Sequence, residues 1–136
     1  MRFRLLMRNA SLVALLLLPV ALAVGSLLCG LVLSGFDKGG VWAFTVLGLA
    51  GATAALNLYL AFIRPWFYSL RTSGRMEGYR RTSGAPLVGT VLVVGAIMMA
   101  FGDWVLAAGG LLVLALDVGG TPWFLAAISR DRSFWE

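Results

Sequence analysis

Asp117 and Asn57 are the polar side chains of this sequence whose surroundings suggest chemistry. Each lies in or at the end of a strongly apolar stretch, the aspartate directly after 104–116 and the asparagine within 41–63. Along an ideal helix, Asp117 lies about 20 Å from the start of its apolar stretch, and Asn57 lies about 24 Å from the start of its own. We therefore expect them at similar depth in a membrane, where an ionisable residue is by default a functional hypothesis.

Two interpretations of Asp117 stay open. In the first, its carboxylate belongs to an intramembrane polar site, with partners among Asn57, Thr53, Arg64 and the N–H groups of 119–120. Glycine and proline directly after it are typical of the broken helices that bind ions or substrates in transporters. In the second, Asp117 is the N-cap of a new helix that has a proline in its first turn. For Asn57, a structural hydrogen bond between helices competes with ligand contact.

The residue inventory excludes several kinds of catalytic and metal site. The chain has no histidine and one cysteine, Cys29. A zinc site is therefore not expected, since histidine is missing and Cys29 is the one thiol of the sequence, and a histidine-dependent triad has no base. An intramolecular disulfide has no second thiol. No combination of nucleophile, base and oxyanion donor is recognisable. We expect no enzyme, no metal and no cofactor.

Composition indicates a membrane protein. Apolar residues make up 60% of the 136 residues and charged residues 12%, against roughly 45–50% and about 25% in soluble domains. The net charge of +5 comes from residues that flank apolar runs. Because a nucleic-acid surface needs a basic face on a folded domain, we expect no nucleic-acid partner.

The apolar runs predict an all-α, polytopic membrane protein with four transmembrane helices arranged as two hairpins. The chain is then a single transmembrane domain, 1–136. Its expected spans are about 10–34, 41–63, 86–101 and 104–128, with a cytoplasmic loop at 64–85. A length of about 20 apolar residues crosses a bilayer core.

The first apolar run could also belong to a secretory signal or a lipoprotein signal. Signal peptides have an apolar core of only about 7–15 residues, and the run from Ala10 to Leu33 is much longer. A lipoprotein signal needs small residues directly before Cys29, where Leu27 and Leu28 stand. We therefore expect an uncleaved first transmembrane helix.

Small residues recur every four positions in that first helix. One row contains Ala21, Gly25 and Cys29, and the adjacent row contains Ser26, Gly30 and Ser34. Small residues let membrane helices approach closely where lipid gives no hydrophobic driving force. The candidate helix-packing residues are Gly25, Cys29 and Gly30.

Basic residues predict the orientation. With four crossings, ten of the eleven basic residues fall on one side and Lys38 alone falls on the other. The positive-inside rule then places both termini and the central loop on the cytoplasmic side of the membrane. The loop repeats Arg-Thr-Ser-Gly and offers candidate lipid or partner contacts, although a plain solvated loop has the same composition. These candidate residues are Arg71, Arg75, Arg80 and Arg81.

Several segments carry a resemblance to a known group of proteins. They are 57–66 (NLYLAFIRPW), 78–80 (GYR), 83–89 (SGAPLVG) and 116–124 (LDVGGTPWF). In these segments the chain resembles uncharacterised four-span inner-membrane proteins of Gram-negative bacteria, some of which look like immunity partners of secreted toxins. The first-span glutamate of small multidrug transporters is missing, as is the Thr/Ser-Phe signature of fluoride channels. The resemblance implies a binding role and assigns no functional residue.

The function expected from these observations is that of a non-enzymatic inner-membrane protein. It would bind a partner within the membrane, as an immunity or accessory protein does. The alternative is a small oligomeric ion or solute transporter with a polar site at Asp117 and Asn57. A lipid-binding role through the arginine loop is a third hypothesis. The expected partners are membrane lipid and either another protein or further copies of the chain.

Overall fold

The structure is a computed structural model that describes residues 2–33, 40–71, 84–85 and 87–130. Every regular element within these ranges is helical, which confirms the expected all-α class. The elements are α1 (Arg2–Val32), α2 (Val41–Leu58), the π-helix η1 (Tyr59–Ile63), α3 (Arg64–Arg71), α4 (Val88–Met99), α5 (Trp104–Leu116) and α6 (Thr121–Arg130).

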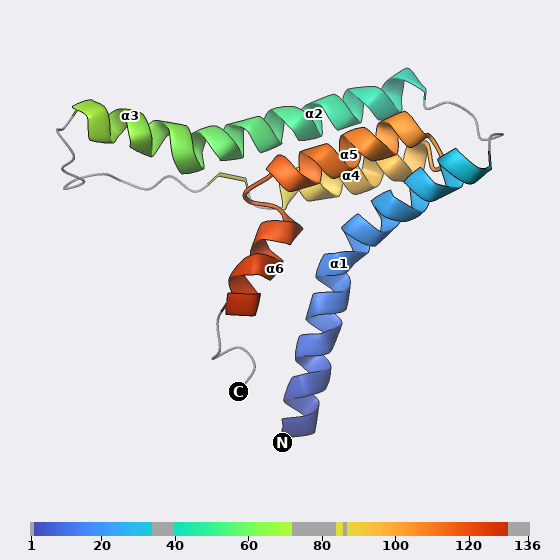
Figure 1. The fold of residues 1–136 in the computed structure, drawn as a ribbon, viewed down its shortest axis with the longest axis horizontal. Helices are drawn as coiled ribbons and strands as arrows, with labels where there is room; N and C mark the ends of the chain where they lie inside the picture. Colours follow the sequence, from blue (N-terminus) through green and yellow to red (C-terminus); the bar gives the residue numbers. More distant parts are fainter. Residues whose placement is uncertain (1, 34–39, 72–83, 86, 131–136) are drawn as a thin grey trace.

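The helices α2, η1 and α3 follow one another without a break and form a long rod, and α4 and α5 lie along the α2 part of it (Figure 1). The C-terminal half of α1 packs against α5, while its N-terminal half turns away from the bundle on the same side as α6. Pro19 lies inside α1. Because proline has no N–H, the helix loses one hydrogen bond there and can bend.

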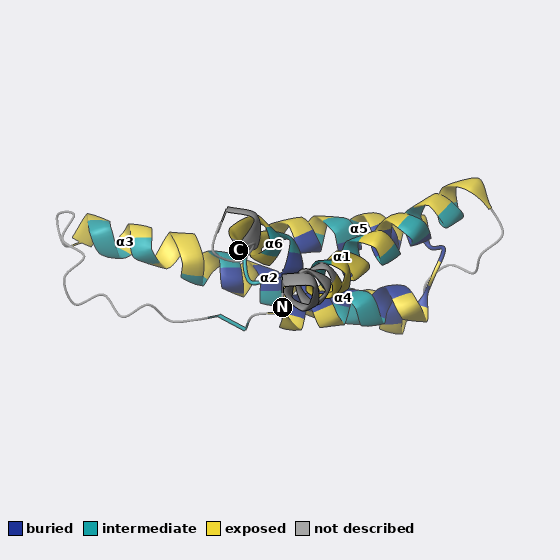
Figure 2. Cartoon of the chain, turned by 90° about the horizontal axis from the view of Figure 1, so that it is seen from below, coloured by how far each residue is buried: buried dark blue, intermediate teal, exposed yellow. Residues whose placement is uncertain are grey.

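Alanine dominates the contacts between the helices. The buried apolar residues are Ala23, Ala43, Ala50, Ala54, Val93, Ala96, Ile97, Ala100, Leu106, Ala107 and Leu114. Small side chains at these contacts let the backbones approach closely, as in other membrane helix bundles. Apart from Val93, Ile97, Leu106 and Leu114, most of the large apolar residues face outward. Figure 2 shows the buried residues where α2, α4 and α5 meet, with exposed residues along α3.

Two helices are long and apolar enough to cross a membrane, over Ser11–Val32 and Val41–Arg71. A third crossing is possible if the pair Trp104–Leu116 and Thr121–Ala127, bent by 40° at the break, forms one broken span. The remaining apolar helix, Val88–Met99, is shorter. The part of the chain that the structure describes is thus a helical protein with two or three candidate membrane spans.

Two helix boundaries differ from the sequence-based expectation. Helix α1 begins at Arg2, eight residues before the expected membrane span, whereas its candidate membrane-crossing part, Ser11–Val32, begins close to the expected residue 10. The second helical rod continues past Ile63 to Arg71, so the first eight residues of the expected loop 64–85 are helical. A helix that is already nucleated adds residues at little cost.

Candidate functional site

The side chains of Asn57 and Asp117 are joined by a direct hydrogen bond. Asn57 Nδ2, near the end of α2, donates to Asp117 Oδ1 at 2.7 Å. Both residues are buried, and Asp117 is fully so. The similar depth expected from helix lengths therefore corresponds to contact between two elements that lie 60 residues apart in the chain.

Asn57 also holds the segment that leads into α4. Its Oδ1 accepts from the Ala85 backbone N–H at 3.0 Å, and its Nδ2 donates to the Ala85 carbonyl at 3.3 Å. The side chain lies directly over Gly84, where an added Cβ would collide with Asn57 Oδ1. A single amide thereby connects α2, the segment before α4 and the end of α5. Such a connection has the interhelical character expected of a polar residue in a membrane helix.

Asp117 ends α5 and organises the break between α5 and α6. Its Oδ1 accepts a second hydrogen bond from Gly119 N at 3.2 Å, and its carbonyl accepts from Gly120 N at 2.8 Å. Helix α6 begins later, since its first hydrogen bond runs from Phe124 N to Gly120 O. Asp117 is therefore the C-cap of α5 and not the N-cap of α6, in contrast to the structural alternative considered from the sequence.

The break is also held by the residue that precedes α4. Leu87 N donates to Gly119 O at 3.0 Å. Leu87 has a φ of 66°, in the left-handed region that side-chain-bearing residues rarely occupy. Unusual backbone of this kind persists where surrounding contacts enforce it, and it concentrates at functional sites.

The second carboxylate oxygen of Asp117 lies among small residues and hydroxyl groups. Oδ2 has no hydrogen-bond partner within the described ranges, and neither does the buried Thr121 Oγ1. An added Cβ on Gly89 would collide with Oδ2, so the carboxylate packs against the bare α-carbon of that glycine. Thr90 Oγ1 accepts a long hydrogen bond from Thr121 N at 3.4 Å. Asp117 Oδ2 and Thr90 Oγ1 therefore lie on the same side of Gly120, where an added Cβ would be 3.1 Å from each, and the buried Thr121 hydroxyl belongs to the next residue of the chain.

The other partners considered for Asp117 lie elsewhere. Thr53 Oγ1 donates to Leu49 O, one turn back in its own helix, at 2.9 Å. Arg64 is exposed at the start of α3. Among the expected partners, Asn57 and the N–H of Gly119 donate to the Asp117 carboxylate, and the N–H of Gly120 donates to the Asp117 carbonyl.

The two rows of small residues in α1 have different surroundings. Gly30 packs against the turn between α4 and α5, where an added Cβ would collide with Gly102 O and lie 2.9 Å from Trp104 N. Ser26 Oγ accepts from Gly102 N at 2.9 Å. By contrast, an added Cβ on Gly25 would meet nothing within 4 Å. Cys29 is a free thiol of intermediate exposure.

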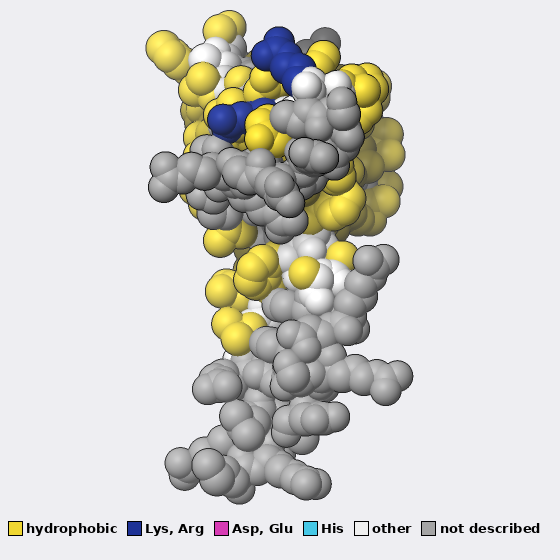
Figure 3. Space-filling view, turned by 90° about the vertical axis from the view of Figure 1, so that its left-hand side faces the viewer, with side chains coloured by type: hydrophobic (Ala, Val, Ile, Leu, Met, Phe, Trp, Pro, Cys, Tyr) yellow, Lys and Arg dark blue, Asp and Glu magenta, His cyan; other side chains and the backbone are white. Residues whose placement is uncertain are grey.

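The candidate loop residues are only partly within the described ranges. Arg71 is exposed at the C-terminal end of α3, whereas Arg75, Arg80 and Arg81 lie outside the described residues. Figure 3 looks onto the α3 end of the molecule and shows basic side chains beside hydrophobic ones. Trp66 and Leu70 are exposed in the same short helix. Basic and aromatic residues together are typical of the membrane–water interface.

Several residues of the site were not singled out from the sequence. They are Ala85, Gly89, Thr90 and Thr121. The available signal was the Gly-Thr pair at 89–90 in an apolar helix and the threonine directly after Gly120, but a single sequence does not show that these positions face Asp117. The described residues contain no group of three or more His, Cys, Asp or Glu that could hold a metal ion.

Fold and site together define a helical protein with candidate membrane spans and a buried polar cluster at a helix break. Comparison of the chain with protein-family models, with characterised protein sequences and with solved structures gives no significant match.

Proposed function

We propose that this chain is a multi-pass protein of a bacterial inner membrane that acts without catalysis, by binding a protein partner within the bilayer. An immunity or accessory protein would work in this way. The observation that carries the proposal is the outward-facing row of small residues on α1. Ala21 is exposed, and Gly25 has open space where its side chain would be.

The contrast between the two rows of α1 supports a role of the outward row in partner binding. The row with Ser26 and Gly30 is used within the fold, because it packs against the turn at Gly102. In the other row, an added Cβ on Gly25 would meet no described atom within 4 Å. On α2, Gly48 likewise meets nothing within 4 Å, and Ala52 is exposed. Contact with lipid does not require small residues, whereas a partner helix can pack closely on such rows.

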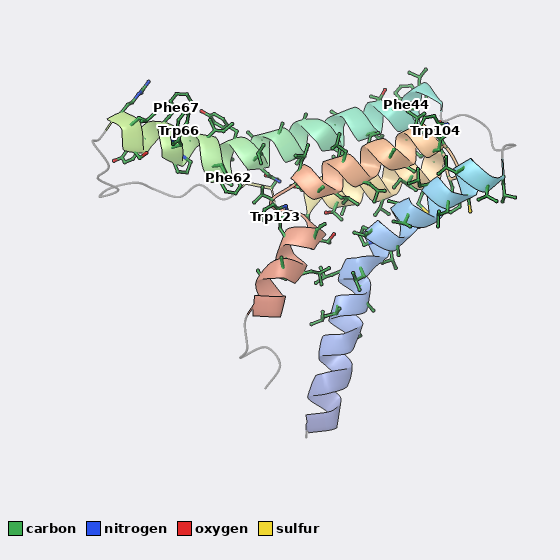
Figure 4. All side chains as sticks on the ribbon, in the orientation of Figure 1. Phe44, Phe62, Trp66, Phe67, Trp104 and Trp123 are labelled. Atoms are coloured by element: carbon green, nitrogen blue, oxygen red, sulfur yellow. The ribbon has the colours of Figure 1, made fainter. Side chains whose placement is uncertain are left out.

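The proposed arrangement in the membrane has four crossings with both termini in the cytoplasm. Aromatic side chains support the placement of α2, since Phe44 and Trp104 lie at one end of the bundle and Phe62, Trp66 and Phe67 lie toward the other (Figure 4). Aromatic residues concentrate at both membrane interfaces. Helix α4 is about 18 Å long, so its crossing would be completed by the residues before it, as that of α5 would be by α6.

The test of partner binding is affinity purification of the tagged chain from native membranes in mild detergent, followed by mass spectrometry. A stoichiometric partner should co-purify with the wild type and be lost in Gly25→Leu, because leucine fills the outward row. Gly95→Leu on α4 is the matched control, since Gly95 also has open space at its Cβ position. Equal recovery of the partner with Gly25→Leu would refute the proposed surface.

A second candidate function, transport of an ion or small solute by an oligomer of the chain, is favoured by a different observation. Asp117 Oδ2 and Thr121 Oγ1 are buried at a break in a candidate span and have no hydrogen-bond partner among the described residues. Unwound helices at membrane depth commonly bind transported ions. Flux into proteoliposomes should fall to background in Asp117→Asn, and wild-type flux in that variant would remove this candidate.

A further inference from the structure

The open side of Gly120 faces three oxygen atoms. A Cβ built on Gly120 would lie 2.9 Å from Asp117 O, 3.1 Å from Asp117 Oδ2 and 3.1 Å from Thr90 Oγ1. The oxygens therefore converge on one region beside the α-carbon. Gly89 bounds the same region, since its own added Cβ would collide with Asp117 Oδ2. Two glycines thus permit a close approach of oxygens that larger residues would prevent.

Hydrogen bonding is distributed unevenly over the Asp117 carboxylate. Oδ1 accepts from Asn57 Nδ2 and from Gly119 N, whereas Oδ2 accepts from no group in the described ranges. Both donors to Oδ1 are neutral amides, so they do not balance a negative charge. A buried charge is costly unless it is paired, and buried polar atoms almost always have a partner.

Hydroxyl groups supply further ligand capacity at the same place. Within the part of the chain that the structure describes, Thr121 Oγ1 is buried without a hydrogen-bond partner, and Thr90 Oγ1 accepts the 3.4 Å bond from Thr121 N. The carbonyl of Asp117 accepts one hydrogen bond, from Gly120 N, and a carbonyl oxygen has a second lone pair. Carboxylate, hydroxyl and carbonyl oxygens are the ligands that hard cations prefer.

The geometry points to a binding site for one monovalent metal cation, Na⁺ or K⁺, between Asp117 Oδ2, the hydroxyls of Thr90 and Thr121 and the Asp117 carbonyl. One carboxylate balances one positive charge, which favours a monovalent over a divalent ion. The inference deepens the second candidate function and rests on it only for movement of the ion. Binding itself depends on the oxygens at the break.

The cation site is tested on the purified full-length chain in detergent. Thermal unfolding is followed in NaCl or KCl titrated against N-methyl-D-glucamine chloride at constant ionic strength. A ligand that binds only the folded state raises the unfolding midpoint with its concentration. The midpoint of the wild type should therefore rise with the concentration of one of the two metal cations, and the rise should reveal which ion the site prefers.

Three variants test whether the cation-dependent rise in the unfolding midpoint comes from the proposed site. Asp117→Asn keeps an oxygen that can accept from Asn57 and Gly119, so the variant should fold, and its midpoint should no longer respond to the cation. Thr121→Val removes a hydroxyl that makes no hydrogen bond to any described residue, and it should weaken the apparent cation affinity about tenfold. Thr53→Val, whose hydroxyl bonds within its own helix, should respond as the wild type does.

Three outcomes would overturn the cation site. The first is a wild-type unfolding midpoint that is identical in all three chlorides. The second is a cation response that persists in Asp117→Asn or is unchanged in Thr121→Val. The third is a midpoint that changes with pH and does not change with the cation, which would assign a proton to Oδ2. Failure of transport is separable from failure of binding. A cation-dependent midpoint together with background flux would refute the transport candidate and leave the site as a structural one.

Discussion

Asn57 and Asp117 form the hydrogen bond that ties the end of α2 to the break between α5 and α6, at 2.7 Å. Asn57 uses the rest of its amide on Ala85, so three separate segments meet at this one side chain. The cluster therefore ties the helices together as well as placing the Asp117 carboxylate.

Replacing Asn57 should destabilise the fold. In Asn57→Leu, Asp117 Oδ1 keeps only the bond from Gly119 N, and the backbone of Ala85 loses both partners. We expect a loss of about 2 kcal/mol in the free energy of unfolding, since an unsatisfied buried group costs roughly 1–3 kcal/mol. Reversible unfolding in mixed micelles measures it. Thr53→Val is the control, because its hydrogen bond lies within one helix. An equal loss of stability in Thr53→Val would contradict a particular contribution of the Asn57 hydrogen bonds.

Gly30 and Gly25 should respond oppositely to alanine. Gly30→Ala places a Cβ against the Gly102 carbonyl, so α1 must shift, and overpacking of this kind costs about 1–3 kcal/mol. Gly25→Ala adds its methyl group to open space and should be neutral or stabilise by up to about 1 kcal/mol through helix propensity. The same unfolding assay compares them. Similar effects of the two changes would contradict the packing of Gly30 on Gly102.

Asp103 should act as the N-cap of α5. Its Oδ1 accepts from Val105 N at 2.9 Å and from Leu106 N at 3.1 Å. Asp103→Ala removes both hydrogen bonds and should cost about 0.5–2 kcal/mol, whereas Asp103→Asn retains an acceptor oxygen and should cost less. If alanine and asparagine lower the free energy of unfolding equally, the cap does not contribute in this way.

Orientation can be measured with single cysteines in a Cys29→Ser background. With both termini in the cytoplasm, Ser133→Cys should resist a membrane-impermeant maleimide in intact spheroplasts and react after permeabilisation. Lys38→Cys should react in both. This difference follows from the distribution of basic residues, ten of eleven on one side. Labelling of residue 133 in intact spheroplasts would rule out the proposed topology.

The sequence predicted the helical class, the main apolar segments and the shared depth of Asn57 and Asp117, because these depend on composition and on a regular rise per residue. It did not predict that Ala85, Gly89 and Thr90 join the site. They do so because the chain before α4 folds back onto Gly119 through the Leu87 hydrogen bond, and such a contact has no local pattern. The number of crossings also depends on whether α5 and α6 form one broken span.

The two rows in α1 illustrate the same limit. Four-residue spacing marks both rows as able to pack, but only the tertiary structure distinguishes the row that contacts Gly102 from the row left open at Gly25. Periodicity identifies a helix face, and the partner of that face comes from contacts distant in sequence.

The π-helix η1 has a geometric consequence for the rod that contains it. A π turn is equivalent to one residue inserted into an α-helix, and one residue turns an α-helix by about 100°. The five residues Tyr59–Ile63 therefore rotate α3 relative to the side of α2 that carries Asn57. Deleting one residue there would restore the uninterrupted spiral and swing Arg64, Trp66 and Arg71 around the axis to another side. The length of one helical turn thus decides which way the basic and aromatic side chains of α3 point.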